Sequence, residues 1–145
     1  MTLISSSYFS EPGINHPVII RTLSENALIK IGNNVGISGG GICAAQKVTI
    51  GNDVMFGANA FVSDNDFHPI DPRNRRNSNE NIKTKPVIIE DNVFIGMNSL
   101  VLKGVKIGKN SVIAAGSIVT SDIPENTIAA GIPAKVISKI EQTIS

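Results

Sequence analysis

The sequence has little of several residue types that commonly build protein cores. It contains no tryptophan, one tyrosine, five phenylalanines and a single cysteine in 145 residues. One cysteine cannot form an internal disulfide, and neither Cys nor His occurs at zinc-finger spacing. Leucine is also scarce, with 5 residues against 35 isoleucines and valines together. Because β-branched residues favour strands whereas helices favour leucine, this composition predicts a β-rich chain rather than a helical bundle.

Charge of one sign is also missing, since 13 Lys and Arg face 12 Asp and Glu, for a formal net charge of +1. Such a chain has no strong field to attract nucleic acid or an anionic membrane. The longest uncharged stretch, residues 31–46, is 16 residues long and too polar to span a bilayer as a helix. The first residues lack the basic and apolar regions of a signal peptide. We therefore expect one cytoplasmic domain with no nucleic-acid partner and no membrane insertion.

An aliphatic residue recurs at every sixth position in the second half of the chain. The six consecutive members of this array are Ile89, Ile95, Val101, Ile107, Ile113 and Val119. Four positions after successive members stand small or β-branched residues, namely Val93, Ser99, Val105, Ser111 and Ser117. The same spacing extends to two earlier runs, with one extra residue between them: Ile31, Ile37 and Cys43, then Ile50, Phe56, Val62 and His68. The chain is therefore a hexapeptide array.

A period of six fits the alternation of a strand but not an α-helix, in which residues six apart lie about 120° from one another. The physical solution is a short strand and a turn in each hexad, with the aliphatic side chain inward. Gly or Asn is expected at the corners, where a positive φ is needed. Asparagines that fit these corners are Asn33, Asn34, Asn52, Asn92 and Asn110. Three sides form a triangular coil of about 18 residues, and roughly five coils fit, each stabilised only by its stacked neighbours.

The pattern divides this single domain into parts: coils at 29–63 and 86–123, a loop at 64–85, and a C-terminal segment at 124–145. The loop is rich in Asn, Asp, Arg and Pro, and long loops without regular structure are usually functional or disordered. We expect the C-terminal segment to leave the period at Pro124, to turn between Gly131 and Pro133, and to end in a short amphipathic tail. The first 28 residues are weakly patterned and receive no assignment.

His68 occupies a hexad position where the other members of the array are mostly aliphatic, in the segment SDNDFHPIDP. Imidazole titrates near pH 6.5, so a histidine at a cleft can take a proton from a hydroxyl and return it to a thiolate. A lone histidine is also commonly a polar residue satisfied at a turn. Three neighbouring carboxylates either orient the ring or cap turns, namely Asp64, Asp66 and Asp71.

The array, the segment NAFVSDNDFHPIDP and the ending GIPAKVI, in this order, resemble the hexapeptide-repeat acetyltransferases of the maltose/galactoside O-acetyltransferase type. Within them, the chain is most similar to small sugar O-acetyltransferases of bacterial polysaccharide loci. The resemblance covers about residues 29–137. It implies an all-β fold, a left-handed parallel β-helix, with one excursion loop. It also implies a homotrimer with active sites between subunits, and acetyl-CoA as co-substrate without a metal.

The resemblance implies roles for particular residues. His68 matches the general base, and Asn59 and Asp66 are assigned to acceptor binding. The Gly96–Met97 turn is expected to supply the backbone N–H that holds the oxyanion, although Met97 replaces the small or hydroxyl residue usual there. Residues expected along the cofactor are Gly96 and Met97, then Ala115, Thr120 and Ser121 on pantetheine and adenosine, and Lys135 near the phosphates.

Several of these residues also have an ordinary structural explanation. Asn59 fits a coil corner, Ala115 suits any tight coil, and Lys135 is a typical solvated charge. Cys43 is interpreted as a small buried hydrophobe and not as a nucleophile. A basic cluster in the loop either meets an acidic sugar or a CoA phosphate or is simply solvated: Arg73, Arg75 and Arg76.

The leading functional hypothesis is direct acetyl transfer from acetyl-CoA to a hydroxyl of a sugar or glycan, with no acyl-enzyme. Aminosugar N-acetylation stays open, as does serine O-acetylation, although the weakly patterned N-terminal residues leave little room for that family's helical region. A zinc enzyme of the γ-carbonic anhydrase type shares the fold, but its metal needs three histidines and only His16 and His68 are present. A scaffolding solenoid without activity is the alternative from another class. The sequence does not identify the acceptor.

Overall fold

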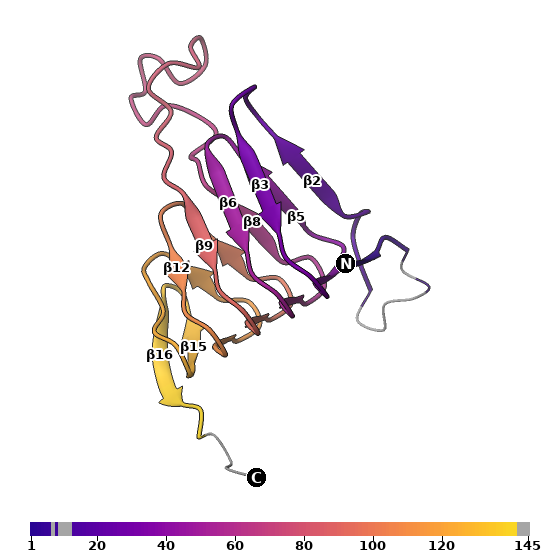
Figure 1. The fold of residues 1–145 in the computed structure, drawn as a ribbon. Coiled ribbons are helices and arrows are strands. Elements are labelled where there is room, and N and C mark those ends of the chain that lie inside the picture. Colours follow the sequence, from indigo (N-terminus) through magenta and orange to yellow (C-terminus); the bar gives the residue numbers. More distant parts are fainter. Residues whose placement is uncertain (7, 9–12, 142–145) are drawn as a thin grey trace.

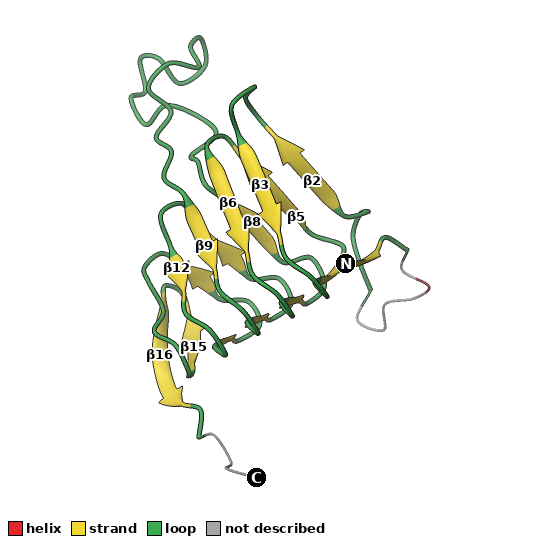
Figure 2. Ribbon diagram, viewed as in Figure 1, coloured by secondary structure: helices red, strands yellow, loops and turns green. Residues whose placement is uncertain are grey.

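The computed structural model describes residues 1–6, 8 and 13–141, and three β-sheets make up its regular structure (Figure 2). Sheet A contains, in spatial order, β1 (Thr2–Ile4), β4 (Gly36–Ser38), β7 (Met55–Phe56), β10 (Phe94–Ile95), β13 (Val112–Ile113), β15 (Thr127–Gly131) and β16 (Ala134–Lys139). Sheet B contains β14 (Ile118–Val119), β11 (Leu100–Val101), β8 (Phe61–Ser63), β5 (Gly41–Ala44) and β2 (Ile19–Thr22). Sheet C contains β12 (Lys106–Ile107), β9 (Val87–Ile89), β6 (Lys47–Ile50) and β3 (Leu28–Ile31). No helix in the described ranges is long and apolar enough to cross a membrane.

The chain visits sheets A, B and C in turn, so that each of the first four circuits adds one strand to every sheet (Figure 1). The fifth circuit adds β13 and β14, and it meets sheet C only through an isolated bridge between Ile123 and Ile107. Neighbouring strands pair in parallel; for example, Ile95 of β10 pairs with Ile113 of β13, one 18-residue coil later. The pairing of β15 with β16 is antiparallel. The structure confirms the predicted left-handed parallel β-helix, a triangular prism whose coils stack along its axis.

The core is the interior of this prism, and it is built from the hexad positions. All six residues of the continuous array are at most 1% exposed, and so are the five small or β-branched residues that stand four positions after the first five members. Complete burial of each aliphatic side chain contributes about 1.5–3 kcal/mol. The buried serines satisfy their hydroxyls on turn carbonyls; Ser111 Oγ, for example, donates to the carbonyl of Pro124 at 2.7 Å. Small polar side chains therefore fit inside the turns without an unpaired group.

The corners use left-handed backbone, as expected. Three of the predicted asparagines have φ between 54° and 60°: Asn34, Asn92 and Asn110. Their side chains form a ladder along the prism, in which Asn92 Nδ2 donates to Asn110 Oδ1 at 3.1 Å and Asn110 Nδ2 donates to Asn126 Oδ1 at 2.8 Å. The prediction is wrong by one residue at Asn33 and Asn52, because Asn34 and Asp53 take the positive φ there. Asn52 Oδ1 instead accepts the Asn33 backbone N–H at 2.9 Å.

The hexad phase is wrong at Cys43, although the prediction that Cys43 is buried is confirmed. Ile42 pairs with Val62 and is fully buried, whereas Cys43 pairs with Ser63, on the outer side of the strand. The slip coincides with a glycine turn in which Gly39 and Gly40 have φ of 61° and 68°, and a Cβ on Gly40 would lie 2.0 Å from the Ala60 carbonyl oxygen. Cys43 is 7% exposed, and burial raises the pKa of its thiol. The thiol therefore stays protonated at neutral pH, as expected of a residue that is not a nucleophile.

Both ends of the chain add strands beyond the clear hexad array. Strands β1 and β2 pair with β4 and β5, so residues that lack a sequence pattern begin the solenoid. The predicted turn between Gly131 and Pro133 is present and joins β15 to β16. The tail that follows is the edge strand β16, with Ala134 buried and Ile137 63% exposed. Residues 142–145 of the C-terminal segment lie outside the described residues.

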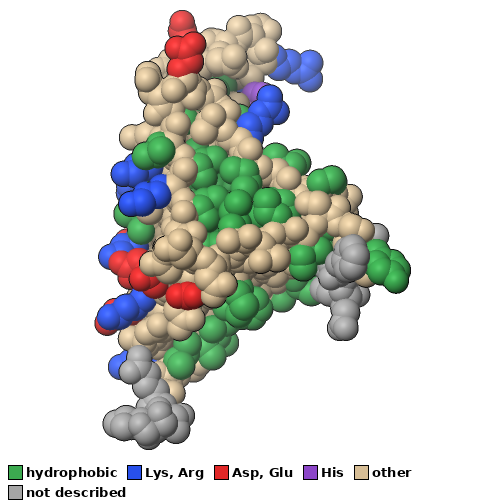
Figure 3. Space-filling model, turned by 45° about the vertical axis from the view of Figure 1, so that its right-hand side comes forward, with side chains coloured by type: hydrophobic (Ala, Val, Ile, Leu, Met, Phe, Trp, Pro, Cys, Tyr) green, Lys and Arg blue, Asp and Glu red, His purple; other side chains and the backbone are tan. Residues whose placement is uncertain are grey.

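The three outer faces of the prism differ in polarity. In Figure 3, charged side chains gather along one edge, beside a broad area of hydrophobic side chains. The outward row on sheet A is apolar: Met55, Phe94, Val112 and Ile128. The corresponding row on sheet B, past Gly41, is also apolar: Ile19, Phe61, Leu100 and Ile118. Sheet C carries charge instead, and an ion pair at 2.7 Å with Lys106 lowers the pKa of the Glu90 carboxyl.

Candidate active site

His68 lies in the loop that leaves the solenoid after β8 and rejoins it at β9 (Figure 1). Its side chain is exposed and its backbone N–H donates to the Asp66 carbonyl at 2.7 Å. Backbone hydrogen bonds close the neck of the loop, from Lys85 to Asp64 at 2.9 Å and from Asp66 to Lys83 at 3.2 Å. The hexad phase therefore fails at His68, because the chain has already left sheet B. The consequence is a histidine held at the mouth of the loop.

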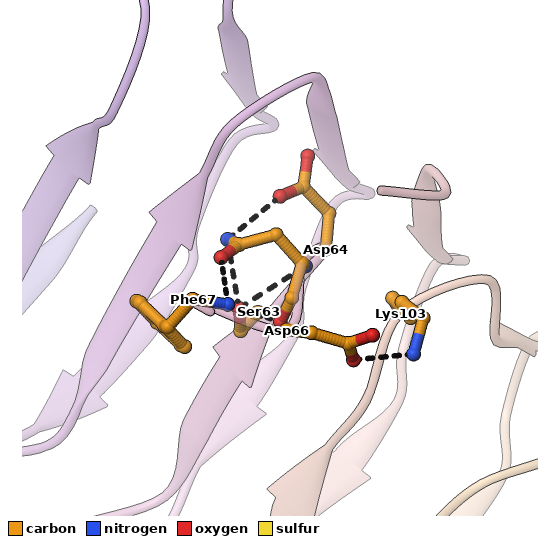
Figure 4. A network of polar contacts seen from close by, with 6 residues as sticks. Ser63, Asp64, Asp66, Phe67 and Lys103 are labelled. Atoms are coloured by element: carbon orange, nitrogen blue, oxygen red, sulfur yellow. Dashed lines mark hydrogen bonds and ion pairs between the residues drawn. The ribbon is translucent and has the colours of Figure 1, made fainter. Parts of the chain in front are cut away.

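The residue before His68 is held in an unusual backbone conformation. Phe67 has φ of 59°, a left-handed value that is a genuine outlier for a bulky side chain. Asn65 stabilises this conformation, because its Oδ1 accepts the Phe67 backbone N–H at 2.8 Å (Figure 4). Backbone strain of this kind costs about 1–3 kcal/mol and clusters at functional sites. No feature of the sequence predicted this conformation.

Asp64 and Asp71 stabilise turns instead of facing the His68 ring. Asp64 is fully buried and its carboxylate accepts three backbone N–H groups at 2.6–2.7 Å, those of Ala45, Gln46 and Lys47. Asp71 accepts the Arg73 backbone N–H at 2.9 Å and pairs with its guanidinium, which lowers the pKa of the Asp71 carboxyl. Turn capping therefore explains both residues.

Asp66 is in a different environment. Its Oδ1 forms an ion pair with Lys103, which follows β11 in the next coil (Figure 4). Its Oδ2 is buried and has no hydrogen-bond partner within the described ranges. A buried carboxylate oxygen without a donor is costly, so it favours an incoming hydroxyl or N–H. Sequence reasoning missed Lys103, because the two residues are 37 positions apart and a lysine in a coil turn is typical of the solvated surface.

A second group of predicted residues lies at the corner between sheets A and B. A Cβ on Gly96 would lie 2.5 Å from the backbone N of Ala115, so only glycine allows the two coils to stack there. The backbone N–H groups of Met97 and Ala115 have no hydrogen-bond partner in the described part of the chain. Lys135 on β16 is exposed and pairs with Ala130, at the end of the same stack. Two free donors and a cation therefore lie along one corner.

Asn59 is at this corner too. Its φ is 60°, and its Oδ1 accepts the Asn15 backbone N–H at 2.9 Å. The backbone of Asn59 is therefore that of a coil corner, as one of its two interpretations expected. Its contact with an acceptor stays a prediction. In the loop, Arg75 donates to the Ile70 carbonyl at 2.6 Å, and Arg76 has no side-chain partner among the residues the structure covers.

The predicted site residues thus form two groups on one chain. Thr120 and Ser121 follow β14 and, by the register of β11 with β14, lie beside Lys103 at the corner between sheets B and C. This corner also holds Asp66 and His68. The other group lies across sheet B: Asn59, Gly96, Met97, Ala115 and Lys135. A strand with its flanking residues separates the corners by about 16 Å, so one copy does not bring the two groups together.

The sequence matches the family described as "Hexapeptide repeat of succinyl-transferase" at residues 47–63 and 86–121. It is 47% identical over 96 residues to the galactoside O-acetyltransferase of Lactococcus lactis, covering 66% of this chain and 45% of that protein. The chain thus spans about half the length of the curated relatives it matches.

Solved structures extend the similarity to the whole fold. A galactoside acetyltransferase in complex with coenzyme A superposes with a TM-score of 0.75 at 35% identity, covering 95% of this chain and 64% of that one. A hexapeptide-repeat acetyltransferase from Vibrio cholerae superposes with a TM-score of 0.72 at 31% identity, covering 86% of this chain and 72% of the other. With a shared repeat, a shared fold and this identity over most of a solved relative, the chain belongs to the hexapeptide-repeat acetyltransferase family.

Proposed function

We propose that the protein is an acetyl-CoA-dependent O-acetyltransferase that acts on a hydroxyl of a sugar or glycan, with His68 as the general base. The observation that carries the proposal is the exposed imidazole at the mouth of a loop whose neck is fixed by hydrogen bonds and by the Asn65–Phe67 turn. The galactoside acetyltransferase that binds coenzyme A, similar over 95% of this chain, supports the choice of co-substrate.

The reaction is a direct transfer. An imidazole nitrogen of His68 accepts the proton of the acceptor hydroxyl as its oxygen attacks the thioester carbonyl carbon. A new C–O bond forms, and the Met97 backbone N–H donates a hydrogen bond to the oxyanion. The C–S bond then breaks, and the imidazolium returns the proton to the departing thiolate. The products are an acetyl ester and free CoA thiol, without an acyl-enzyme.

The corner between sheets A and B fits the co-substrate. The unpaired N–H groups of Met97 and Ala115 lie on successive coils, where they suit the carbonyl and amide oxygens of a thioester and a pantetheine arm. Lys135 adds a positive charge at the end of this stack, suited to phosphate. Thr120 and Ser121, at the other corner, would contact the co-substrate only from a second copy. They remain proposals for its adenosine end.

The separation of the two groups favours active sites shared between copies, and we propose a homotrimer. His68 of one copy would then meet the Met97 corner of its neighbour. The apolar outer rows of sheets A and B support this assembly, since Met55 is 56% exposed, Phe94 40% and Leu100 37% in the single chain. Contiguous apolar faces of this kind mark interaction surfaces. The charged sheet C would stay in solvent.

The test combines binding of acetyl-CoA by calorimetry with release of CoA thiol in the presence of sugars, aminosugars and serine. We expect His68→Ala to keep acetyl-CoA binding and to lose acceptor-dependent thiol release by about 10²- to 10⁴-fold. Lys135→Ala should weaken binding instead. His16→Ala is the matched control, because His16 is also exposed but lies in the N-terminal segment and not in the loop that carries His68. Undiminished thiol release by His68→Ala, or no acetyl-CoA binding by the folded wild type, would overturn the proposal.

A further inference from the structure

A pocket of about 440 Å³ lies between the loop and the first two coils, next to the His68 segment. It is lined by residues from three segments: Leu23 and Ala45 of the coil turns, Asn65 and Phe67 of the outgoing loop, and Asn79, Ile82 and Thr84 of the returning loop. A hydrogen bond of 3.3 Å from the Thr84 hydroxyl to Gln46 Oε1 ties the returning loop to the coil. The volume is within the range of pockets that hold small ligands.

The lining combines apolar surface with neutral polar groups. Phe67 is 43% exposed and Leu23 is 41% exposed, so both leave apolar surface uncovered. Asn65, Asn79 and Thr84 add amide and hydroxyl groups, and none of the seven lining residues is ionisable. A sugar ring presents the same two kinds of surface, C–H groups on its face and hydroxyls on its edge. A charged ring would lose hydration in this pocket without gaining an ion pair.

The position of the pocket relates it to the chemistry. Phe67 directly precedes His68, and Figure 4 places Phe67 on the side of the segment away from the Asp66–Lys103 pair. The left-handed φ of Phe67 and the hydrogen bond from its N–H to Asn65 fix the direction of this segment. The ring centroid of Phe67 also lies 6.5 Å from that of Phe61 on β8, with the two ring planes tilted by 39°. Phe67 thus contributes exposed aromatic surface to a pocket that adjoins His68 in the chain.

We propose that this pocket is the acceptor subsite and binds one uncharged sugar ring, stacked on Phe67, with a hydroxyl presented to His68. The inference rests on the proposed function for the identity of the reaction, but binding in the pocket does not depend on turnover. It also makes Phe67 a specificity-determining residue that favours neutral over carboxylated or phosphorylated rings.

The test uses ligand-observed NMR titration of the protein with methyl glycosides of galactose, glucose and N-acetylglucosamine, and with the methyl glycoside of glucuronic acid. We expect the neutral probes to bind and the glucuronide to bind about tenfold more weakly or not at all. Phe67→Leu keeps apolar bulk but removes the ring face and should weaken the neutral probes by about two- to tenfold. Phe67→Tyr retains the face and should bind as wild type does.

Two controls separate the outcomes. Ile70→Ala changes an exposed residue of the same loop that does not line the pocket, and it should leave binding unchanged. Asn79→Ala removes a lining amide from an exposed position and should weaken binding even if Phe67→Leu proves unstable. The subsite would be overturned if both Phe67→Leu and Asn79→Ala bound the neutral probes as tightly as the wild type does. It would also be overturned if the wild type preferred the glucuronide. If these variants still transferred acetyl groups with an unchanged KM for the acceptor, the proposed function would stand but the acceptor would bind elsewhere.

Discussion

At the scale of single residues, the pair formed by Asp66 and Lys103 connects the His68 segment to the solenoid. The two side chains are 23% and 31% exposed, and they join a loop to a coil turn 37 residues later in the chain. The Asp66 carbonyl also accepts the His68 N–H at 2.7 Å. We therefore propose Lys103 as a positioning residue, because its contact with the His68 segment runs through Asp66.

Lys103→Met should misplace the His68 segment while preserving the fold. An uncompensated, partly buried Asp66 costs stability, which we expect to fall by about 1–2 kcal/mol, between the values for surface and buried pairs. We expect kcat to fall by about ten- to a hundredfold, since a displacement of about 1 Å can cost about 10²-fold, and we expect the KM for acetyl-CoA to stay unchanged. Lys103→Arg, which keeps the charge, should restore kcat. Steady-state kinetics on both variants checks this, and equal losses in kcat for Met and Arg would argue against the positioning role.

At the scale of elements, coil stacking fixes the residues that the turns accept. Gly36 begins β4 and Gly96 directly follows β10, both strands of sheet A. A Cβ on Gly96 would lie 2.5 Å from the backbone nitrogen of Ala115, whereas a Cβ on Gly36 would meet nothing within 4 Å. The atom in the way at Gly96 belongs to the backbone of the next coil, so it cannot move aside as a flexible side chain could. The demand for glycine therefore depends on how closely the next coil approaches, and it recurs at another corner, where a Cβ on Gly108 would lie 2.5 Å from the backbone N of Glu125.

Gly96→Ala should destabilise the protein by about 1–3 kcal/mol, the usual cost of overpacking, because coils must separate to admit the methyl group. Gly36→Ala is the matched control: it should be neutral or slightly stabilising, since Ala loses less backbone entropy on folding than Gly. Chemical denaturation of both variants measures the difference. Similar free energies of unfolding for the two variants would contradict this account of stacking.

The elements also differ in how far the sequence could predict them. The hexad array defined the core from Ile89 to Val119, because an interior that repeats every six residues leaves a repeating sequence. Strands β1, β2 and β16 left no such pattern, since they pair with a single neighbouring coil and bury few residues. His68 was evident as a departure from the array. Lys103 and the Phe67 pocket were not, because they depend on contacts between the loop and distant coils.

At the scale of the whole molecule, two of the three outer faces are suited to contact with further copies of the chain. Sheets A and B present rows of apolar side chains, whereas sheet C presents charges such as Lys106 and Glu90. The two groups of site residues lie at opposite edges of sheet B. In the proposed trimer, covering the apolar faces would also bring His68 of one copy toward the Met97 corner of another.

This arrangement predicts that assembly and activity are lost together. Leu100→Glu on sheet B places an unpaired charge in the proposed interface, where an ionised group without a partner is strongly disfavoured, so we expect monomers by light scattering and at least a 10²-fold loss of acetyl transfer. Ile88→Glu is the matched control, because Ile88 is an outward aliphatic of similar exposure, 42% against 37%, on the charged sheet C. It should assemble and react as wild type does. Monomeric Leu100→Glu that retains full activity would show that one copy suffices, and the 16 Å between the corners would then have to be bridged by the substrates themselves.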